Sequence, residues 1–213
     1  MPLSEKIALW ADTLRDLSAL GLHYSNNIYD QERYTKVQEI ALAMLALATN
    51  EPLAKLEPLQ MPIFSRPSPL VGGDAAVIDD VGHLLLIQRA DNGQWAMPGG
   101  LSQVGETPAE GAVREAFEET GVRCRAVALV GVFDSRLWGT TFPHHMYQFL
   151  FLCKPLNGKK TSTPTTPQEV WDIGWFTEDA LPANIDPGHI SKIPEAFRVW
   201  KGDHTTFFDV QSQ

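Results

Sequence analysis

The chain has 213 residues, of which 44% are hydrophobic, so it can build the core of one ordinary domain plus an appendage. Its formal net charge of −9 argues against a DNA or RNA binder that acts by neutralising phosphates. Charged residues in the first 20 positions argue against a signal peptide, and no uncharged apolar run approaches the ~18 residues that a membrane-spanning helix needs.

Residues 1–50 are predicted to form a small domain of two amphipathic helices. Gly21 is expected to end the first helix, and Asp30 is expected to cap a second helix that ends at Asn50. A hairpin of this size buries little core alone, so we expect it to dock on the rest of the chain or on a second subunit of a homodimer. The side chains expected to face inward are Ile7, Trp10, Leu14 and Leu17 in the first helix and Tyr34, Val37, Ile40, Ala41, Met44, Leu45 and Ala48 in the second.

Prolines mark residues 51–70 as an extended linker, and from residue 71 the pattern changes to strands, so residues 71–213 are expected to form a second domain. Asp74–Ile78 and His83–Arg89 are expected to pair as a hairpin. Further strands are expected at 95–97, 123–133, 145–156 and 169–176. A helix capped by Asp186 should follow, with Ile190, Ile193, Phe197 and Trp200 facing inward and a kink at Pro194.

The two cysteines, Cys124 and Cys153, each lie in an apolar, strand-like segment. Such residues usually act as small core side chains. Nothing in the sequence indicates disulfide bonds, so we expect the reducing environment of the cytoplasm.

The segment 98–122 is the most informative part of the chain. Thr107, Pro108 and Glu110 have the types and spacing of an N-cap, a first helical residue and a capping box. Gly121 suits the left-handed residue that ends a helix. The sequence therefore predicts a helix that begins after Thr107 and ends before Gly121.

Three carboxylates share one face of this helix, because Glu115, Glu118 and Glu119 stand at i, i+3 and i+4. Arg114 is placed to pair with Glu118, and Glu106 lies just ahead of the helix. Most glutamate runs are solvated helix faces. A cluster this dense repels itself unless cations bind, and Mg²⁺ prefers carboxylate oxygen while leaving positions for water and substrate phosphate.

The whole pattern from Gly100 to Val122 reads Gly, five residues, Glu, seven residues, then Arg-Glu-x-x-Glu-Glu-x-Gly and a hydrophobic residue. It resembles the Nudix box at every defining position, with a departure only at Ala116, where the family usually has a bulkier apolar residue. The resemblance implies an α+β fold, namely an α/β/α sandwich with a mixed sheet, preceded here by the small helical-hairpin domain. It also implies a hydrolase that cleaves the diphosphate bond of a nucleoside diphosphate joined to another group, X, with Mg²⁺ or Mn²⁺ as cofactor.

The resemblance carries metal binding over to five positions, which are Gly100, Glu106, Glu115, Glu118 and Glu119. Gly100 would offer its backbone carbonyl, and Glu106 would be an auxiliary carboxylate. Arg114 would orient the glutamates. The candidates for the general base that activates water are Glu115 or Glu119 in the box and Glu169 outside it.

Similarity to one Nudix subgroup extends beyond the box. Gly21–Ser25, Tyr29-Asp30, Glu32–Tyr34 and Phe207–Asp209 look like segments of the subgroup with a helical N-terminal domain, which includes bacterial ADP-ribose and CDP-choline pyrophosphatases. The similarity covers nearly the whole chain. It implies substrates of the ADP-ribose or CDP-choline type. The apolar faces of the hairpin predict a homodimer, and the hydropathy and net charge predict no membrane and no stable nucleic-acid partner.

Other side chains are candidates for substrate contact. Arg89 ends a strand before the box and has the geometry to bind a phosphate or a box glutamate. Trp95 and Trp138 are candidates to stack on a base, although core packing competes with that role. His144 and His145 are adjacent on a predicted strand, so they point to opposite faces and are poor candidates for one metal site.

Two other functions use the same features. One is RNA 5′-pyrophosphate removal or RNA-end processing, which the net charge disfavours unless a local basic groove exists. The other is a non-catalytic nucleotide-sugar sensor, which the intact set of box ligands disfavours. A metal-dependent phosphate-release assay separates an enzyme from a sensor.

Overall fold

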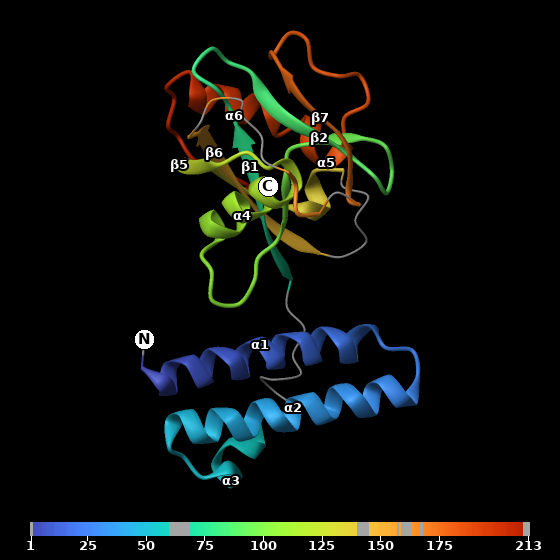
Figure 1. Cartoon of the computed structure of the whole chain (residues 1–213), viewed down its shortest axis with the longest axis vertical. Helices are drawn as coiled ribbons and strands as arrows, with labels where there is room; N and C mark the ends of the chain where they lie inside the picture. Colours follow the sequence, from blue (N-terminus) through green and yellow to red (C-terminus); the bar gives the residue numbers. More distant parts are fainter. Residues whose placement is uncertain are drawn as a thin grey trace. The chain divides into compact units, whose positions relative to one another are not determined.

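The computed structural model describes residues 2–59, 69–139, 145–156, 158, 163–166 and 168–210. The chain divides into two compact units (Figure 1), of which the first holds Met1–Ser68 together with Gln103–Gly105 and the second holds Pro69–Ser102 and Glu106–Gln213. None of the helices in the described part of the chain combines the length and the apolar character that crossing a membrane requires.

The first unit is an αα-hairpin, as predicted. Helix α1 (Leu3–Tyr24) lies beside α2 (Ile28–Thr49), and a short helix, α3 (Leu53–Leu56), and a 3₁₀ turn (Glu57–Leu59) follow (Figure 1). Asn50 ends α2 in the left-handed conformation, with φ of 53°. Residues 53–59 are therefore helical and not extended as predicted, while residues 60–68 of the predicted linker lie outside the described residues.

The predicted end of the first helix, the predicted cap of the second and one predicted inward side chain are wrong. Gly21 lies inside α1 and does not end it, because the ring of Tyr34 occupies the space where a β-carbon of residue 21 would be. The cap of α2 is Asn27, whose side chain accepts a hydrogen bond from the backbone of Asp30 at 2.8 Å. Trp10 is 54% exposed, because it lies away from the face of α1 that packs on α2.

The buried residues on the contact face of α1 are small, which allows close approach of the helices. Ala11 and Ser18 are buried on it, at 1% and 0% exposure. This face turns the larger side chains of α1 outward, and Leu17 is 56% exposed. On α2, Ile40 is 48% exposed, also against prediction.

The second unit contains two sheets. The strands are β1 (Leu70–Val77), β2 (Leu84–Arg89), β3 (Trp95–Ala96), β4 (Gly99–Leu101), β5 (Cys124–Asp134), β6 (Met146–Pro155), β7 (Val170–Phe176) and β8 (Phe207–Phe208). A five-stranded mixed sheet has the order β4-β1-β6-β5-β8, in which β1 runs parallel to β6 and β5 parallel to β8. A three-stranded antiparallel sheet has the order β3-β2-β7.

The predicted hairpin between the first two strands is only partly correct. Its turn forms, with the amide of Gly82 donating to the carbonyl of Asp79 at 3.1 Å. Ile78 and Leu84 make a single bridge, after which β1 and β2 enter different sheets. This divergence opens space between β1 and β2 at the end where the site lies.

Helices cover both faces of the mixed sheet, which gives the predicted α/β/α arrangement (Figure 1). Helix α4 (Pro108–Thr120) packs on one face, where Ala112 and Ala116 are fully buried against Ala75 and Val77. Helix α6 (Ile193–Trp200) packs on the other face over a second core that includes Phe133 and Leu150. Both cysteines are buried and free, as predicted.

The C-terminal helix differs from the prediction. It consists of α5 (Pro187–Ile190), which Asp186 caps, and α6, with a break at Ser191 and Lys192 in place of a kink at Pro194. Pro194 stands at the start of α6, where a missing backbone N–H costs nothing. Ile190 is 48% exposed and does not face inward.

We predict that Gly73→Ala lowers the free energy of unfolding by about 1–3 kcal/mol, the usual cost of overpacking. Gly73 lies on β1 under α4, and a β-carbon there would stand 2.8 Å from the carbonyl oxygen of Pro108 and 3.2 Å from the β-carbon of Ala112. Urea unfolding measures the change. Arg125→Ala, at an exposed position on β5, is the control and should change stability by less than about 0.5 kcal/mol. Equal stability of the two variants would contradict the close packing of α4 on β1.

Candidate active site on helix α4

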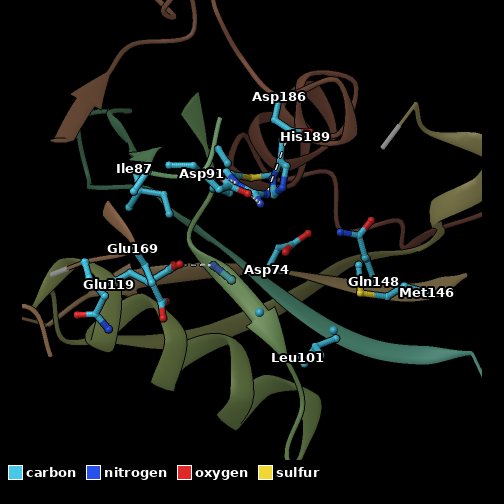
Figure 2. A pocket seen from close by; sticks show the side chains of 18 residues that line it. Asp74, Ile87, Asp91, Leu101, Glu119, Met146, Gln148, Glu169, Asp186 and His189 are labelled. Carbon is cyan, nitrogen blue, oxygen red and sulfur yellow. Dashed lines mark hydrogen bonds and ion pairs between the residues drawn. The ribbon is translucent and has the colours of Figure 1, made fainter. Parts of the chain in front are cut away.

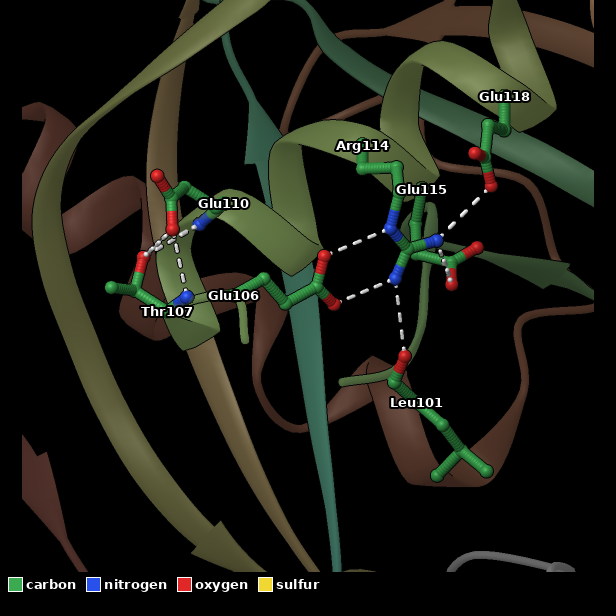
Figure 3. A network of polar contacts seen from close by, with 7 residues as sticks. All are labelled: Leu101, Glu106, Thr107, Glu110, Arg114, Glu115 and Glu118. Atoms are coloured by element: carbon green, nitrogen blue, oxygen red, sulfur yellow. Dashed lines mark hydrogen bonds and ion pairs between the residues drawn. The ribbon is translucent and has the colours of Figure 1, made fainter. Parts of the chain in front are cut away.

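Helix α4 starts as the sequence predicts. The side chain of Thr107 accepts from the amide of Glu110 at 3.2 Å, and the carboxylate of Glu110 accepts from the amide of Thr107 at 2.8 Å (Figure 3). Pro108 is the first helical residue, and Gly121 ends the helix with φ of 69°. These caps fix the first turn of α4 and therefore the position of Glu106 just ahead of it.

Arg114 gathers three carboxylates around one guanidinium group (Figure 3). Its Nε and Nη2 donate to the two oxygens of Glu106 at 3.0 and 2.8 Å, and its Nη1 donates to Glu115 at 2.7 Å and to Glu118 at 3.0 Å. Nη2 also donates to the carbonyl of Leu101 at 3.2 Å. Hydrogen bonding to Glu106 is the main reason that the pKa of Arg114 lies above its ordinary value. The predicted pairing of Arg114 with Glu118 is confirmed.

Glu115 stands between Arg114 and the backbone of β4. Burial raises the pKa of its carboxyl, and the charges of Glu118 and Glu169 raise it further, while Arg114 opposes the shift. A β-carbon at Gly100 would lie 2.6 Å from the carboxyl carbon of Glu115. Glycine is thus needed at position 100 for the carboxylate to approach the strand this closely.

Glu119 points away from the arginine. Its side chain accepts from the amide of Gly99 at 3.0 Å, and the residue is only 7% exposed. Burial raises the pKa of Glu119 to about 8, and the nearby charges of Glu115, Glu169 and Asp74 raise it as well. Negative charge at this end of the site is therefore poorly compensated by the protein itself.

A cavity of about 740 Å³ opens beside Glu119, between β1, β2, β4 and β6 (Figure 2). Glu119 and Glu169 lie at one end of it, Gln148 lies at the other, and Asp74 lies between them. Backbone hydrogen bonds position the segment that carries Glu169, because the amide of Thr165 donates to the carbonyl of Glu118 at 2.8 Å and the amide of Ala90 donates to that of Glu169 at 2.9 Å.

The predicted metal ligands do not all face this cavity. Gly100 and Glu119 line it, whereas Glu106 and Glu118 are held by Arg114. In the described part of the chain, no three acidic, histidine or cysteine side chains are close enough to hold a metal ion as they stand. The donor set nevertheless fits a hard divalent cation, because it offers oxygen atoms only and because Glu115 and Glu119 have raised pKa values that a cation would reverse.

Arg89 lines the cavity but does not pair with a glutamate of the box. Its Nε and Nη2 donate to the carboxylate of Asp91 at 3.0 and 2.6 Å, and its Nη1 lies 3.7 Å from Asp186. The side chain is 37% exposed, so it remains open to an anion.

The structure places the two tryptophans predicted to contact substrate in the core and outside the cavity wall. The ring of Trp95 packs edge-on to Phe176 at 5.0 Å. The indole Nε1 of Trp138 donates to Asp209 at 2.9 Å, and its ring packs on Phe133 at 5.1 Å. Both rings therefore have the core-packing role that the sequence left open as the alternative to base stacking.

Of the two adjacent histidines, only His145 lies among the described residues. Nε2 of His145 lies 3.3 Å from Asp134, which is not part of the cavity. His144 lies outside the described residues.

The residues near the cavity that were not predicted as site residues include Asp74, Gln148, His189 and Lys192. Two of them carry a signal in the sequence. Asp74 is a charged residue inside an otherwise apolar strand, and Lys192 stands among the apolar positions of the C-terminal helices. Charged residues at core positions are rare unless they are paired, so they are candidates for a polar site.

Comparison with known proteins agrees with this geometry. Residues 70–196 match the family model of the NUDIX domain, and residues 5–59 match that of the "UDP-X-like, N-terminal oligomerisation domain". The chain is 28% identical over 204 residues to the Bacillus subtilis protein "Putative ADP-ribose pyrophosphatase YjhB", which covers 93% of this chain and 95% of that protein.

Two solved structures are similar as well. A UDP-X diphosphatase is 25% identical with a TM-score of 0.60, and the match covers 97% of this chain and 99% of that one. An ADP-ribose pyrophosphatase from Streptococcus suis is 26% identical with a TM-score of 0.57, covering 67% and 100%. The complete box on α4, the fold around it and these matches show that the chain belongs to the Nudix family of pyrophosphatase hydrolases.

Proposed function

We propose that the protein hydrolyses the diphosphate bond of nucleoside diphosphate-X compounds, of the ADP-ribose or CDP-choline type, to a nucleoside monophosphate and phospho-X. The observation that carries the proposal is the buried carboxylate of Glu119, which faces a cavity together with Glu169 and forms no ion pair among the described residues. The names of the full-length relatives, an ADP-ribose pyrophosphatase and a UDP-X diphosphatase, support this substrate class.

Nudix hydrolases generally use divalent metal ions, and we propose Mg²⁺ or Mn²⁺ here. Glu115, Glu118 and Glu119 would hold the metal with the carbonyl of Gly100, and Glu106 would assist. When bound, the metal would supply positive charge for the diphosphate and would make a water acidic enough to attack near neutral pH.

The protein's own groups would then position substrate and move one proton. Glu119 or Glu115 in the box, or Glu169 opposite, accepts the proton of the attacking water, because these three carboxylates interact across one end of the cavity. Arg114 positions Glu115 and Glu118 by hydrogen bonds. Arg89, open on one side, binds a phosphate oxygen of the substrate.

We also propose a homodimer. Leu3, Trp10, Leu17 and Tyr24 recur every seven residues along α1, and each is at least 43% exposed. Seven residues are close to two helical turns, so these side chains form one apolar stripe. The match of residues 5–59 to an oligomerisation domain supports pairing of this unit between two copies.

We predict that Glu119→Gln lowers kcat by about 10²-fold or more, equivalent to about 2.7 kcal/mol in the barrier. The substitution keeps the shape and removes a negative charge that the site needs for its metal. Steady-state kinetics with ADP-ribose measures the loss. Glu178→Gln, at an exposed ion pair with Lys201 outside the cavity, is the matched control and should retain wild-type kcat. Wild-type turnover of Glu119→Gln would refute the assignment.

The substrate class predicts a specific pattern of products. ADP-ribose and CDP-choline should yield AMP and CMP in a reaction that EDTA abolishes, and oxidised nucleoside triphosphates should be poor substrates. Chromatography of the products with Mg²⁺ and with Mn²⁺ decides this. A protein that cleaves only triphosphates, or only 5′-triphosphorylated RNA, would overturn the proposal, and one that binds these compounds without cleaving them would be a sensor.

The dimer predicts that Trp10→Glu combined with Leu17→Glu yields a monomer, because two charges would enter the apolar stripe. Light scattering at micromolar protein should give twice the monomer mass for the wild type and the monomer mass for the variant. Arg125→Glu, on an exposed position of β5, is the control. We expect Mg²⁺ binding to be unchanged, because every metal ligand lies in the second unit. A monomeric wild-type protein would sink this proposal.

A further inference from the structure

One carboxylate oxygen of Asp74 is buried in the cavity wall without a hydrogen-bond donor among the described residues. Asp74 is 5% exposed, and its Oδ2 has no hydrogen-bond partner among the described residues. Nζ of Lys192 is the nearest cation, at 3.8 Å, which is too long for a hydrogen bond. A buried acceptor left unpaired costs about 1–3 kcal/mol, so a ligand that donates to Asp74 would recover this energy.

Lys192 fixes the side chain of Gln148, which lies next to Asp74. The lysine is fully buried and donates to Oε1 of Gln148 at 2.5 Å. A lysine ammonium only donates, so the atom of Gln148 that faces it must be the carbonyl oxygen. The amide NH₂ of Gln148 is thereby turned toward Asp74 and the cavity (Figure 2).

A second unpaired group comes from α5. His189 lines the cavity, is 7% exposed, and its Nδ1 has no hydrogen-bond partner among the described residues. Burial lowers the pKa of His189, so the imidazole is neutral near pH 7 and one ring nitrogen accepts while the other donates. This end of the cavity thus presents a carboxylate acceptor, an amide donor and an imidazole.

The rest of the cavity wall indicates what kind of group fits. Ile87, Met97 and Met146 provide aliphatic surface, and among the described residues that line the cavity there is no phenylalanine, tyrosine or tryptophan. A planar base is commonly stacked on an aromatic ring, whereas a sugar needs partners for hydroxyl groups that both donate and accept.

We propose that Asp74, Gln148 and His189 form a subsite for the hydroxyl groups of a sugar ring adjoining the diphosphate, and that Lys192 is a positioning residue that orients Gln148. The inference deepens the proposed function and rests on it for the adjoining diphosphate. The sugar is either part of X or the ribose of the nucleoside, because both adjoin the diphosphate and carry the same hydroxyl chemistry.

Kinetics of Asp74→Asn with three substrates tests the subsite and identifies the sugar. The substrates are ADP-ribose, with sugars on both sides, CDP-choline, with ribose only in the nucleoside, and 2′,3′-dideoxy-CDP-choline, without sugar hydroxyls. If the subsite holds the sugar of X, kcat/KM should fall about 10-fold or more for ADP-ribose alone, mainly through KM. If it holds the nucleoside ribose, the first two substrates should lose equally and the third should not change.

Other patterns overturn the subsite. An equal loss on all three substrates would place Asp74 in the metal or catalytic assembly, and no loss on any would show that its carboxylate contacts no substrate. Asp80→Asn is the matched control, because this aspartate lies on the same unit with its side chain 91% exposed and outside the cavity. If Asp74→Asn does not fold, His189→Leu carries the same test, because it removes the other unpaired group.

A binding experiment separates failure of the subsite from failure of the proposed function. Saturation-transfer NMR with D-ribose in EDTA needs neither metal nor turnover. The wild type and Asp80→Asn should transfer saturation to the sugar, and Asp74→Asn should not. No transfer from the wild type would refute the subsite even if diphosphates are hydrolysed, while transfer from a protein that hydrolyses nothing would refute the proposed function alone.

Discussion

Self-repulsion among carboxylates is the constraint on which the site depends. One face of α4 carries Glu115, Glu118 and Glu119, and Arg114 neutralises only part of this charge. Arg114 can do so because its planar fork reaches Glu106 bidentately while it also binds the helix glutamates. Glu119, four residues beyond Glu115, is left to the amide of Gly99. The chain thus separates its acidic cluster into a part held by an arginine and a part that faces the cavity.

Close approach of backbone elements is what allows this separation. Gly73 lets α4 settle on β1, and Gly100 admits the carboxylate of Glu115 against β4. A side chain at position 99 would collide with Oδ1 of Asp74 at 2.5 Å. The same short strand therefore lies between Glu119 on one side and Asp74 on the other. Glycines in β4 place two carboxylates from different elements at one cavity without bringing them into contact.

Local sequence signals predicted the elements well and their partners less well. The capping box of Thr107 and Glu110 and the left-handed Gly121 fix α4 by interactions within the helix, so the sequence contains all the information needed. The prediction that Gly21 ends α1 is wrong, because a glycine can either end a helix or allow close packing. Here the outcome depends on Tyr34, which lies on another helix. The separation of β1 and β2 into two sheets likewise depends on pairing with β6 and β7, which lie far along the chain. The helix period predicts that three glutamates share one face, but it does not predict where their side chains point. Hydrogen bonds from Arg114 and from the amide of Gly99 decide that.

The two ends of the cavity lack different things. The Glu119 end lacks positive charge, and the Asp74 end lacks a hydrogen-bond donor. At the Glu119 end the protein supplies too much negative charge, which a cation must balance before an anionic diphosphate can approach. At the Asp74 end, Lys192 already balances the charge within ion-pair distance, and what remains unmet is a hydrogen bond. A charged group would gain little there, whereas a neutral hydroxyl satisfies the acceptor without adding charge. A substrate with an anionic diphosphate and a neutral hydroxylated group satisfies both ends of the cavity. The electrostatics of the cavity therefore favour the orientation with the diphosphate at the Glu119 end and the hydroxyl groups at the Asp74 end.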